Sequence, residues 1–293
     1  MTPAVTRRRF LSIAAATGAL SLAGLAAGGA SDRGGRIVWR GRALGAEAEI
    51  RLAAEDETAA RTAIARAVAE AERLEAIFSL YVPQSEIVRL NRDGRIESAS
   101  LDLRRVIAAS QRWGVLTGGG FDVTVQPIWD LFARHFSADG ADVAGPADDA
   151  IAAACAKVDY RAIEIDGVSV AFLRPGMAMT LNGIAQGYIT DRVADVLADA
   201  GFAHALIDMG EIAAHGPPPG EAGWQVGIED PRARGRIIDR VVLGPRQAMA
   251  TSSGFGTRFD PEGRHHHIFV PATGRSAHAV VSVTVLAGNA FVA

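Results

Sequence analysis

The stretch His204–Ala250 decides the fold, and it reads HALIDMGEIAAHGPPPGEAGWQVGIEDPRARGRIIDRVVLGPRQAMA. Short apolar segments rich in Val and Ile alternate in it with turns that contain Gly and Pro, a pattern typical of strands. The predicted strands are His204–Met209, Trp224–Glu229, Ile237–Leu243 and Gln247–Ala250. No amphipathic helix pattern separates them, so we expect neighbouring strands to pair as antiparallel hairpins.

All four predicted helices lie before this stretch, and each keeps apolar residues at helical spacing. They cover Thr58–Phe78, Leu101–Leu116, Ala150–Val158 and Ile184–Ala200. Further strands are predicted at Ala48–Leu52, His266–Val270 and Val280–Leu286. This segregation predicts an α+β fold, a single domain with antiparallel sheets and packed helices. No G-x-G-x-x-G follows a predicted strand and no G-x-x-x-x-G-K-[ST] occurs, which argues against Rossmann and P-loop proteins.

The N-terminal residues predict export. Arg7–Leu11 reads RRRFL, a twin-arginine pattern, and the apolar stretch Ile13–Ala27 is shorter than the roughly 20 residues that span a bilayer. We therefore expect residues 1–30 to be a Tat signal read by the Tat export machinery, with a retained N-terminal anchor as the alternative. The predicted location is the periplasm, and the predicted domain is residues 31–293. The single cysteine, Cys155, excludes a disulfide within the chain.

The overall charge bears on the class of partner. The formal net charge of the 293 residues is −3. Nucleic-acid binding depends on neutralising phosphates with an excess of Lys and Arg, so we expect no nucleic-acid partner.

Four polar islands interrupt the apolar pattern. They are Ser79–Asn91, Gly119–Pro127, Thr180–Asp191 and Ala250–Ala277. Taken singly, each has a structural explanation, such as Ser85 or Asn182 capping a helix. The third island also has a functional explanation. A loop that contains Gly and opens a helix directs free N–H groups at one point, which suits a phosphate.

The fourth island contains three consecutive histidines, His265–His267. On a strand, His265 and His267 would share a face and His266 would point away. Three interpretations remain open: a metal-binding pair, a general base, and histidines with a purely structural role. An imidazole titrates near neutral pH, which suits a general base.

Taken together and in order, the motifs resemble the ApbE family, the FAD:protein FMN transferases. They are Phe78–Tyr81 (FSLY), Phe121–Thr124 (FDVT), Gln186–Asp191 (QGYITD), Ala250–Gly254 (ATSSG) and His267–Gly274 (HIFVPATG). The resemblance covers the chain from about Arg42 onward and implies a T-fold-type domain. It also implies that FAD is split, that its FMN half is transferred to a Ser or Thr hydroxyl of a partner flavoprotein, and that AMP leaves.

The same resemblance implies site residues and Mg²⁺. Cofactor contacts are expected at Leu44, Tyr81, Gly120, Phe121, Asp122, Thr180, Gln186, Thr251, Ser252 and Ile268. His267 is expected to be the catalytic base, and Gly183 to face the metal through its backbone. Two alternatives remain: a non-catalytic flavin-binding or flavin-donating protein, and an FAD pyrophosphatase giving FMN and AMP.

Departures from the family pattern affect the expected details. Leu44–Ala46 (LGA) replaces the usual Met-Gly-Thr, Thr180 replaces Asp, and Gln186 replaces Lys or Glu, so the effect of Ala46, Thr180 and Gln186 on FAD affinity is open. The family's Asp and Thr metal ligands are expected beyond Ala293, so we expect a truncated C-terminus, poor Mg²⁺ binding and slow transfer. The Tat pattern and Gln186 are similar to the NosX-like periplasmic branch, whose expected acceptor is a membrane-bound NosR-like protein of nitrous oxide respiration.

Overall fold

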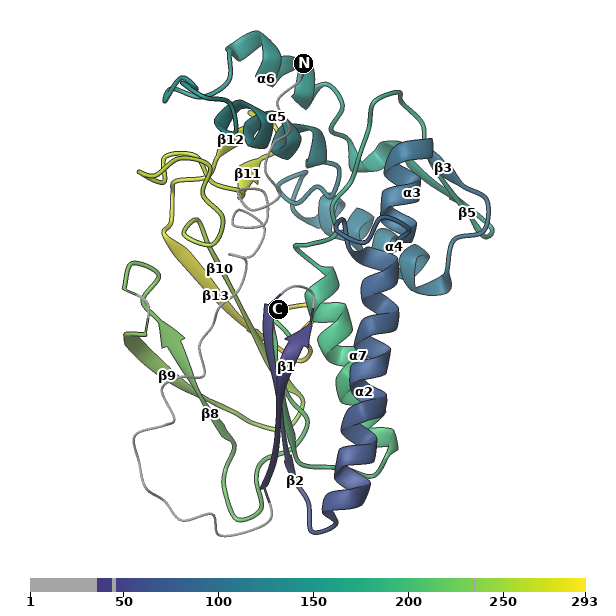
Figure 1. The fold of residues 1–293 in the computed structure, drawn as a ribbon, viewed down its shortest axis with the longest axis vertical. Helices are drawn as coiled ribbons and strands as arrows, with labels where there is room; N and C mark the ends of the chain where they lie inside the picture. The colour runs from purple at the N-terminus through teal and green to yellow at the C-terminus, as the bar shows by residue number, and fades with distance from the viewer. Residues whose placement is uncertain (1–35, 44–45, 234) are drawn as a thin grey trace. The chain divides into compact units, whose positions relative to one another are not determined.

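The computed structural model describes residues 36–43, 46–233 and 235–293 (Figure 1). They form two compact units built from alternating parts of the chain. Unit 1 contains Glu75–Ala185 and Gly254–Val280; unit 2 contains the described residues up to Leu74, Gln186–Ser253 and Val281–Ala293. The predicted signal at residues 1–30 and the predicted cofactor contact Leu44 lie outside the described residues.

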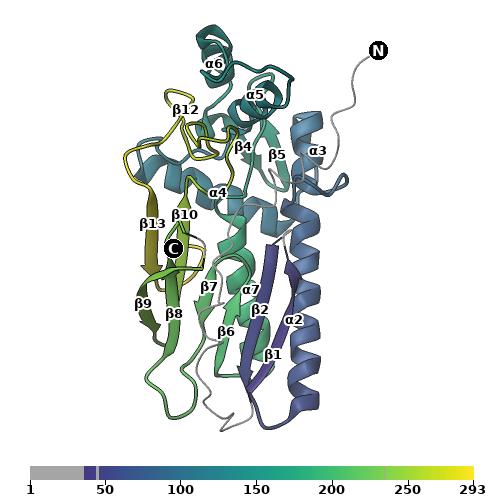
Figure 2. The same ribbon diagram turned by 60° about the vertical axis from the view of Figure 1, so that its left-hand side comes forward.

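Unit 2 is built on a six-stranded sheet in the order β1-β2-β6-β7-β10-β13, antiparallel at every pairing. Its strands are β1 (Arg36–Ala43), β2 (Ala46–Ala53), β6 (Ala205–Asp208), β7 (Ile212–Ala214), β10 (Gln247–Ser253) and β13 (Ser282–Ala287). A separate hairpin pairs β8 (Trp224–Glu229) with β9 (Ile237–Leu243). Figure 2 shows the strands of the large sheet side by side.

Two long helices cover the sheet of unit 2, α2 (Glu57–Phe78) and α7 (Ala185–Asp199) (Figures 1 and 2). Both carry an apolar stripe that is removed from water, the main stabilising contribution to such packing. The fully buried residues of these helices and the strands next to them include Leu52, Leu74, Ile189, Val193, Leu197 and Ile207.

Unit 1 is mostly helical. Its helices are α3 (Glu86–Asp93), α4 (Leu101–Leu116), α5 (Gln126–Phe136), α6 (Asp148–Cys155) and the 3₁₀ turn η2 (Tyr160–Ala162). Its strands are β3 (Arg95–Ile96), β4 (Ile163–Asp166) and β5 (Ser169–Phe172) in the order β3-β5-β4, and the pair β11 (Phe269–Val270) and β12 (Arg275–Ser276). The rings of Phe132, Phe136, Phe259 and Phe269 form one of its cores.

The predicted α+β class is confirmed, since helices combine with antiparallel sheets. The strand predicted at His266–Val270 is too long, because only Phe269–Val270 is a strand. The main-chain N–H of His266 donates to the side chain of Ser276 (2.8 Å) instead of to a ladder carbonyl. Helix α5 was not predicted, although Pro127 in its first turn is a common helix start.

The first polar island has the structural role considered above. Ser85 caps α3, since its hydroxyl accepts the N–H of Val88. Glu86 accepts the N–H of Ser100, which itself caps α4. Within the part of the chain described here, no helix combines the length and the apolar composition that crossing a membrane requires.

Candidate functional site

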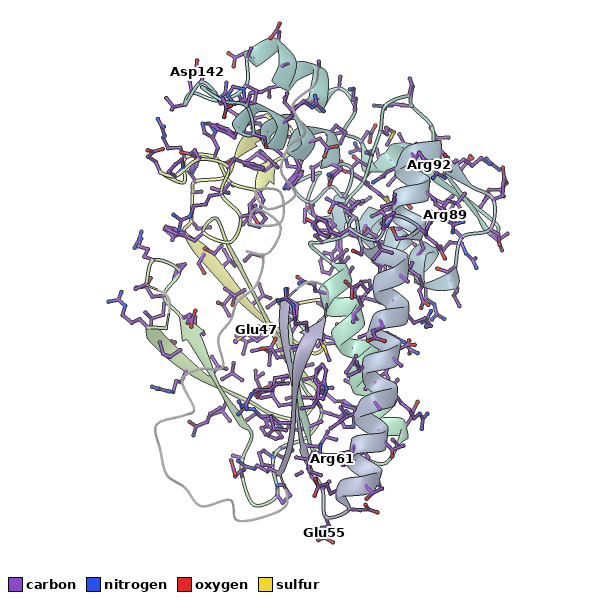
Figure 3. The ribbon with its side chains drawn as sticks, in the orientation of Figure 1. Glu47, Glu55, Arg61, Arg89, Arg92 and Asp142 are labelled. Carbon is purple, nitrogen blue, oxygen red and sulfur yellow. The ribbon has the colours of Figure 1, made fainter. Side chains whose placement is uncertain are left out.

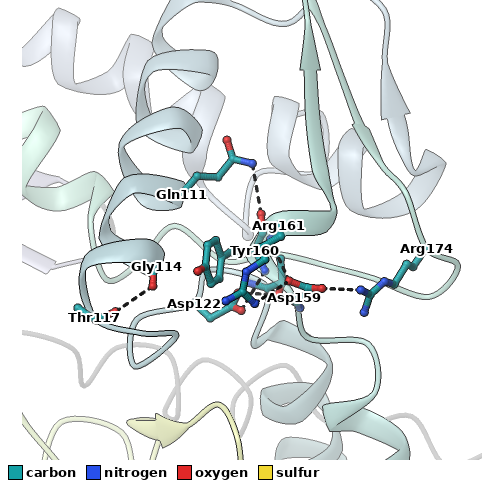
Figure 4. Close-up of polar contacts among 9 residues, drawn as sticks. Gln111, Gly114, Thr117, Asp122, Asp159, Tyr160, Arg161 and Arg174 are labelled. Carbon is teal, nitrogen blue, oxygen red and sulfur yellow. Dashed lines mark hydrogen bonds and ion pairs between the residues drawn. The ribbon is translucent and has the colours of Figure 1, made fainter.

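Asp122 is the centre of a buried hydrogen-bond network in unit 1 (Figure 4). Its Oδ1 accepts the main-chain N–H of Thr124 (2.8 Å) and the Thr124 hydroxyl (2.6 Å). Its Oδ2 accepts the N–H of Tyr160 (3.0 Å). The Thr124 oxygen in turn accepts the N–H of Asp159 (2.8 Å). The carboxylate therefore ties the 121–124 segment to η2, and its oxygens are engaged within the protein.

The turn before Asp122 presents Gly120 and Phe121. The hydroxyl of Thr117, at the end of α4, accepts the N–H of Phe121 (2.9 Å). Gly118 and Gly119 have φ of 60° and 85°, values that L side chains rarely adopt, so this turn needs glycine. The position of Gly120–Asp122 is thus set by local backbone geometry and by the Asp122 network.

The loop that opens α7 lies beside this segment within unit 1. The N–H of Thr180 donates to the Val123 carbonyl (2.8 Å), and a Cβ added at Gly183 would lie 3.8 Å from the Phe121 ring. Both polar atoms of the Asn91 carboxamide bond to the main chain of Met179, each at 2.8 Å, and fix the approach to the loop. The structure therefore brings together Phe121, Asp122, Thr180 and Gly183.

Tyr81 is held in a turn that follows α2. The Ser79 hydroxyl accepts the N–H of Tyr81 (3.1 Å), and the Ser85 hydroxyl donates to the Ser79 carbonyl (2.7 Å). The Tyr81 residue is 47% exposed, so the ring is accessible for stacking on a planar ligand.

The three histidines have different surroundings in unit 1. His265 packs against the rings of Phe132 and Phe136. His266 is buried, and its ring lies 5.1 Å from that of His278. Among the described residues, no three His, Cys, Asp or Glu side chains form a group that could hold a metal. The histidine run therefore does not form a metal site with acidic neighbours there.

His267 has the geometry of a base. Its Nδ1 lies 3.1 Å from the Thr257 carbonyl oxygen and 3.3 Å from the Thr257 main-chain nitrogen. The shorter contact, to the carbonyl, favours the proton on Nδ1, and the unprotonated Nε2 can then accept another. Burial lowers the pKa of His267 below its ordinary 6.5, although the bond to Thr257 opposes this shift. The imidazole is therefore neutral at neutral pH. Ile268, the next predicted contact, is half-buried.

The remaining predicted contacts lie in unit 2. The hydroxyls of Thr251 and Thr284 face each other across β10 and β13 at 2.8 Å, and Ser252 next to them is exposed. The Gln186 side chain lies against Gly210, because a Cβ added there would be 2.6 Å from the Gln186 Nε2. Gln186 thus lies at the turn between β6 and β7, and Thr251 contacts the same turn through the N–H that it donates to the Glu211 carboxyl.

Sequence reasoning missed two carboxyl groups of that turn, Asp208 and Glu211. Burial is the main cause that raises the pKa of Asp208 to about 7 and that of Glu211 to about 8. Strongly shifted groups of this kind are enriched at functional sites. The only signal in the sequence is two acids flanking Met-Gly at the end of an apolar strand.

The Gln186–Asp191 motif has a structural role in unit 2. The Asp191 carboxylate accepts the N–H groups of Ala290 (2.8 Å) and Phe291 (2.9 Å). A side chain at Gly187 would overlap the Ala290 carbonyl, so only glycine allows this approach. The Tyr188 ring meets that of Phe291 edge to face at 5.3 Å. Helix α7 therefore holds the segment after β13 in place.

Replacing Asp191 with Ala is expected to free this segment. Two amides then lose their acceptor, at a cost of about 1–3 kcal/mol each where the site stays buried. Hydrogen exchange at Ala290 and Phe291 should become at least about tenfold faster. Asp195→Ala, on the same helix, serves as the control, and equal protection in both variants would contradict the assigned role.

Comparison with known proteins places these features in context. The model of the ApbE family matches residues 44–293. A Vibrio cholerae protein named FAD:protein FMN transferase is 31% identical over 213 residues, 71% of this chain and 63% of the relative, so the chain spans less than two thirds of that relative. A Klebsiella pneumoniae protein of the same name is 27% identical, covering 89% of this chain and 77% of the relative.

A solved structure is similar as well. The crystal structure of the ApbE protein from Thermotoga maritima superposes with a TM-score of 0.78 at 26% identity, covering 88% of this chain and 83% of the other. The fold and the motifs therefore agree with one another over most of the chain.

Proposed function

Because the chain belongs to the ApbE family, we propose that it is an FAD:protein FMN transferase that moves FMN from FAD to a hydroxyl of a partner flavoprotein. Relatives that carry this name support the proposal. The observation that carries it is His267, a neutral imidazole whose Nδ1 is bonded to Thr257 and whose Nε2 has no hydrogen-bond partner among the described residues.

The proposed reaction balances as one phosphoryl-type transfer. The acceptor's Ser or Thr oxygen attacks the phosphorus on the FMN side of the diphosphate and forms a phosphodiester bond. The P–O bond to the AMP phosphate breaks, and AMP leaves with the bridging oxygen. The hydroxyl proton passes to Nε2 of His267, which returns to the neutral state by releasing it to solvent or to AMP.

Other residues of the chain would bind and orient FAD. The Gly120–Asp122 turn and the Thr180–Gly183 loop offer main-chain groups next to each other in unit 1. Tyr81 offers an accessible ring, and Thr251 and Ser252 offer hydroxyls in unit 2. Main-chain N–H groups and hydroxyls are suited to phosphate oxygens, and positioning supplies much of the rate in this class of reaction.

Mg²⁺ is implied by the family resemblance, with the main chain of Gly183 as one expected ligand. The ion prefers six oxygen ligands in near-octahedral geometry. Among the described residues, no three His, Cys, Asp or Glu side chains are grouped to hold a metal, so Mg²⁺ there would depend on main-chain oxygens, single carboxylates and the phosphates of FAD. No step above therefore depends on the ion.

The proposal also concerns the acceptor protein and the cellular compartment. We infer that the protein works in the periplasm and modifies a membrane-bound, NosR-like flavoprotein in nitrous oxide respiration. The support is the twin-arginine pattern at Arg7–Leu11, which fits Tat export, and Gln186 in place of Lys or Glu.

Co-expression with a candidate acceptor tests the proposed function. The acceptor's intact mass should increase by one covalently bound FMN, and replacing its target hydroxyl residue with Ala should abolish the increase. AMP release without acceptor labelling would establish an FAD pyrophosphatase instead. Bound FAD with neither product would establish a flavin-binding protein.

A further inference from the structure

Two acids at the β6–β7 turn, the buried Asp208 and the half-buried Glu211, have no part in the proposed chemistry. Asp208 is 7% exposed, and its Oδ1 accepts the N–H of Gly210 (3.1 Å). Glu211 follows Gly210, whose φ of 103° makes the turn tight. Two carboxyl groups so close together in a buried site cannot both ionise without a large cost.

The charges around the pair compensate it only in part, because Arg51 lowers the pKa of Asp208 while Glu49 raises it. Glu49 of β2 lies directly opposite Asp208 in the sheet. Arg51 and Arg40 both pair with Glu49, so the nearby cations are already committed to another carboxylate. The residues that contact the turn from α7 and β10 are uncharged: Gln186, Thr190 and Thr251.

Glu211 shows the consequence most clearly. Its carboxyl accepts the main-chain N–H of Thr251, and its main-chain carbonyl accepts from the Thr190 hydroxyl (3.4 Å). Its Oε2, however, is buried without a hydrogen-bond partner among the described residues. An ionised oxygen in this position would be costly, whereas a bound proton removes the charge. The pKa values of about 8 for Glu211 and about 7 for Asp208 agree with this geometry.

The pair is connected to two of the proposed FAD contacts. Thr251 is connected through the hydrogen bond from its N–H to the Glu211 carboxyl. Gln186 is connected through its contact with Gly210, between the two acids. A second negative charge at this turn would disturb both residues and repel the FAD diphosphate.

We propose that Asp208 and Glu211 form a proton-binding site that positions Gln186 and Thr251, and that FAD binding there is coupled to proton uptake by the pair. The coupling rests on the proposed function, since it assumes that FAD occupies these residues. By linkage, a proton that favours FAD binding is itself bound more tightly once FAD is present. Glu211 is in this account a positioning residue and takes no part in the chemical step.

Calorimetry of FAD binding at pH 8 in two buffers of different ionisation enthalpy measures the coupling. The wild-type protein should take up a fraction of a proton per FAD, and its Kd should rise about fivefold between pH 6.5 and pH 9, which corresponds to the pKa of Glu211 raised by about one unit on binding. Glu211→Gln keeps an acceptor for the Thr251 N–H and stays neutral. It should bind FAD with no proton uptake and a much flatter pH profile.

Glu47→Gln is the matched control, because Glu47 (labelled in Figure 3) is an exposed acid near the start of β2. It should behave as the wild type. Proton uptake that persists in Glu211→Gln, or wild-type binding without proton uptake, would overturn the proposal.

A second measurement does not require FAD. Infrared difference spectra should show the C=O stretch of a protonated carboxylic acid that disappears as the pH rises through about 7–8 and is absent from the double variant Asp208→Asn/Glu211→Gln. No such band in the wild type would overturn the proton site. A band with no FAD binding at any pH would instead overturn the proposed function, and the coupling with it.

Discussion

Replacing His267 with Ala is expected to lower kcat for FMN transfer by about 10²–10⁴-fold, the usual contribution of a general base. The acceptor hydroxyl would then lose its proton acceptor, while FAD binding should change much less. Single-turnover labelling of an acceptor at saturating FAD measures this effect. His278→Ala is the control, because His278 is an exposed histidine of the same segment.

The pH dependence of transfer provides a separate test of His267. Burial lowers the pKa of its imidazole below 6.5, so the neutral base persists at lower pH than for an exposed histidine. The wild-type rate should therefore fall only below about pH 6.5, as the imidazole becomes protonated. This acid limb should disappear in His267→Ala. A variant that labels the acceptor at the wild-type rate would refute the role.

Replacing Asp122 with Ala is expected to destabilise unit 1 by about 3–5 kcal/mol, the sum of two or more buried groups left without a partner. Its carboxylate accepts three hydrogen bonds, from Thr124 and Tyr160, and the residue is only 9% exposed. Truncation leaves buried N–H donors unsatisfied. Urea unfolding followed by fluorescence measures the loss, since Trp113 and Trp129 both lie in unit 1.

Asp139→Ala is the control for this prediction, because Asp139 is an exposed acid of the same unit and should change stability by less than about 0.5 kcal/mol. Equal midpoints for Asp122→Ala and Asp139→Ala would show that the network does not hold η2 to the 121–124 segment. Loss of FAD binding by a variant of wild-type stability would instead give the Asp122 carboxylate a direct role in the ligand site.

The regular elements were the most accessible to sequence reasoning. Helix α7 was predicted to within a residue or two at each end, because Ile189, Val193 and Leu197 repeat at helical spacing and are all buried. The hairpin of β8 and β9 was also predicted, since its strands are short apolar segments separated by turn residues.

Other features depend on contacts between distant residues and could not be predicted locally. His266 leaves the expected strand because Ser276, ten residues away, takes its hydrogen bonds. The Glu211 carboxyl is desolvated by contacts with segments far along the chain, among them Thr251. Neither local spacing nor composition distinguishes this acid from the exposed acids of other turns.

The ratio of AMP released to acceptor labelled, in a reaction of the purified protein with FAD and acceptor, tests the central claim most directly. The account predicts one AMP for each FMN bound covalently to the acceptor, and both products formed about 10²–10⁴-fold more slowly by His267→Ala. AMP formed in excess of labelled acceptor, or no AMP at all from FAD-saturated protein, would contradict it.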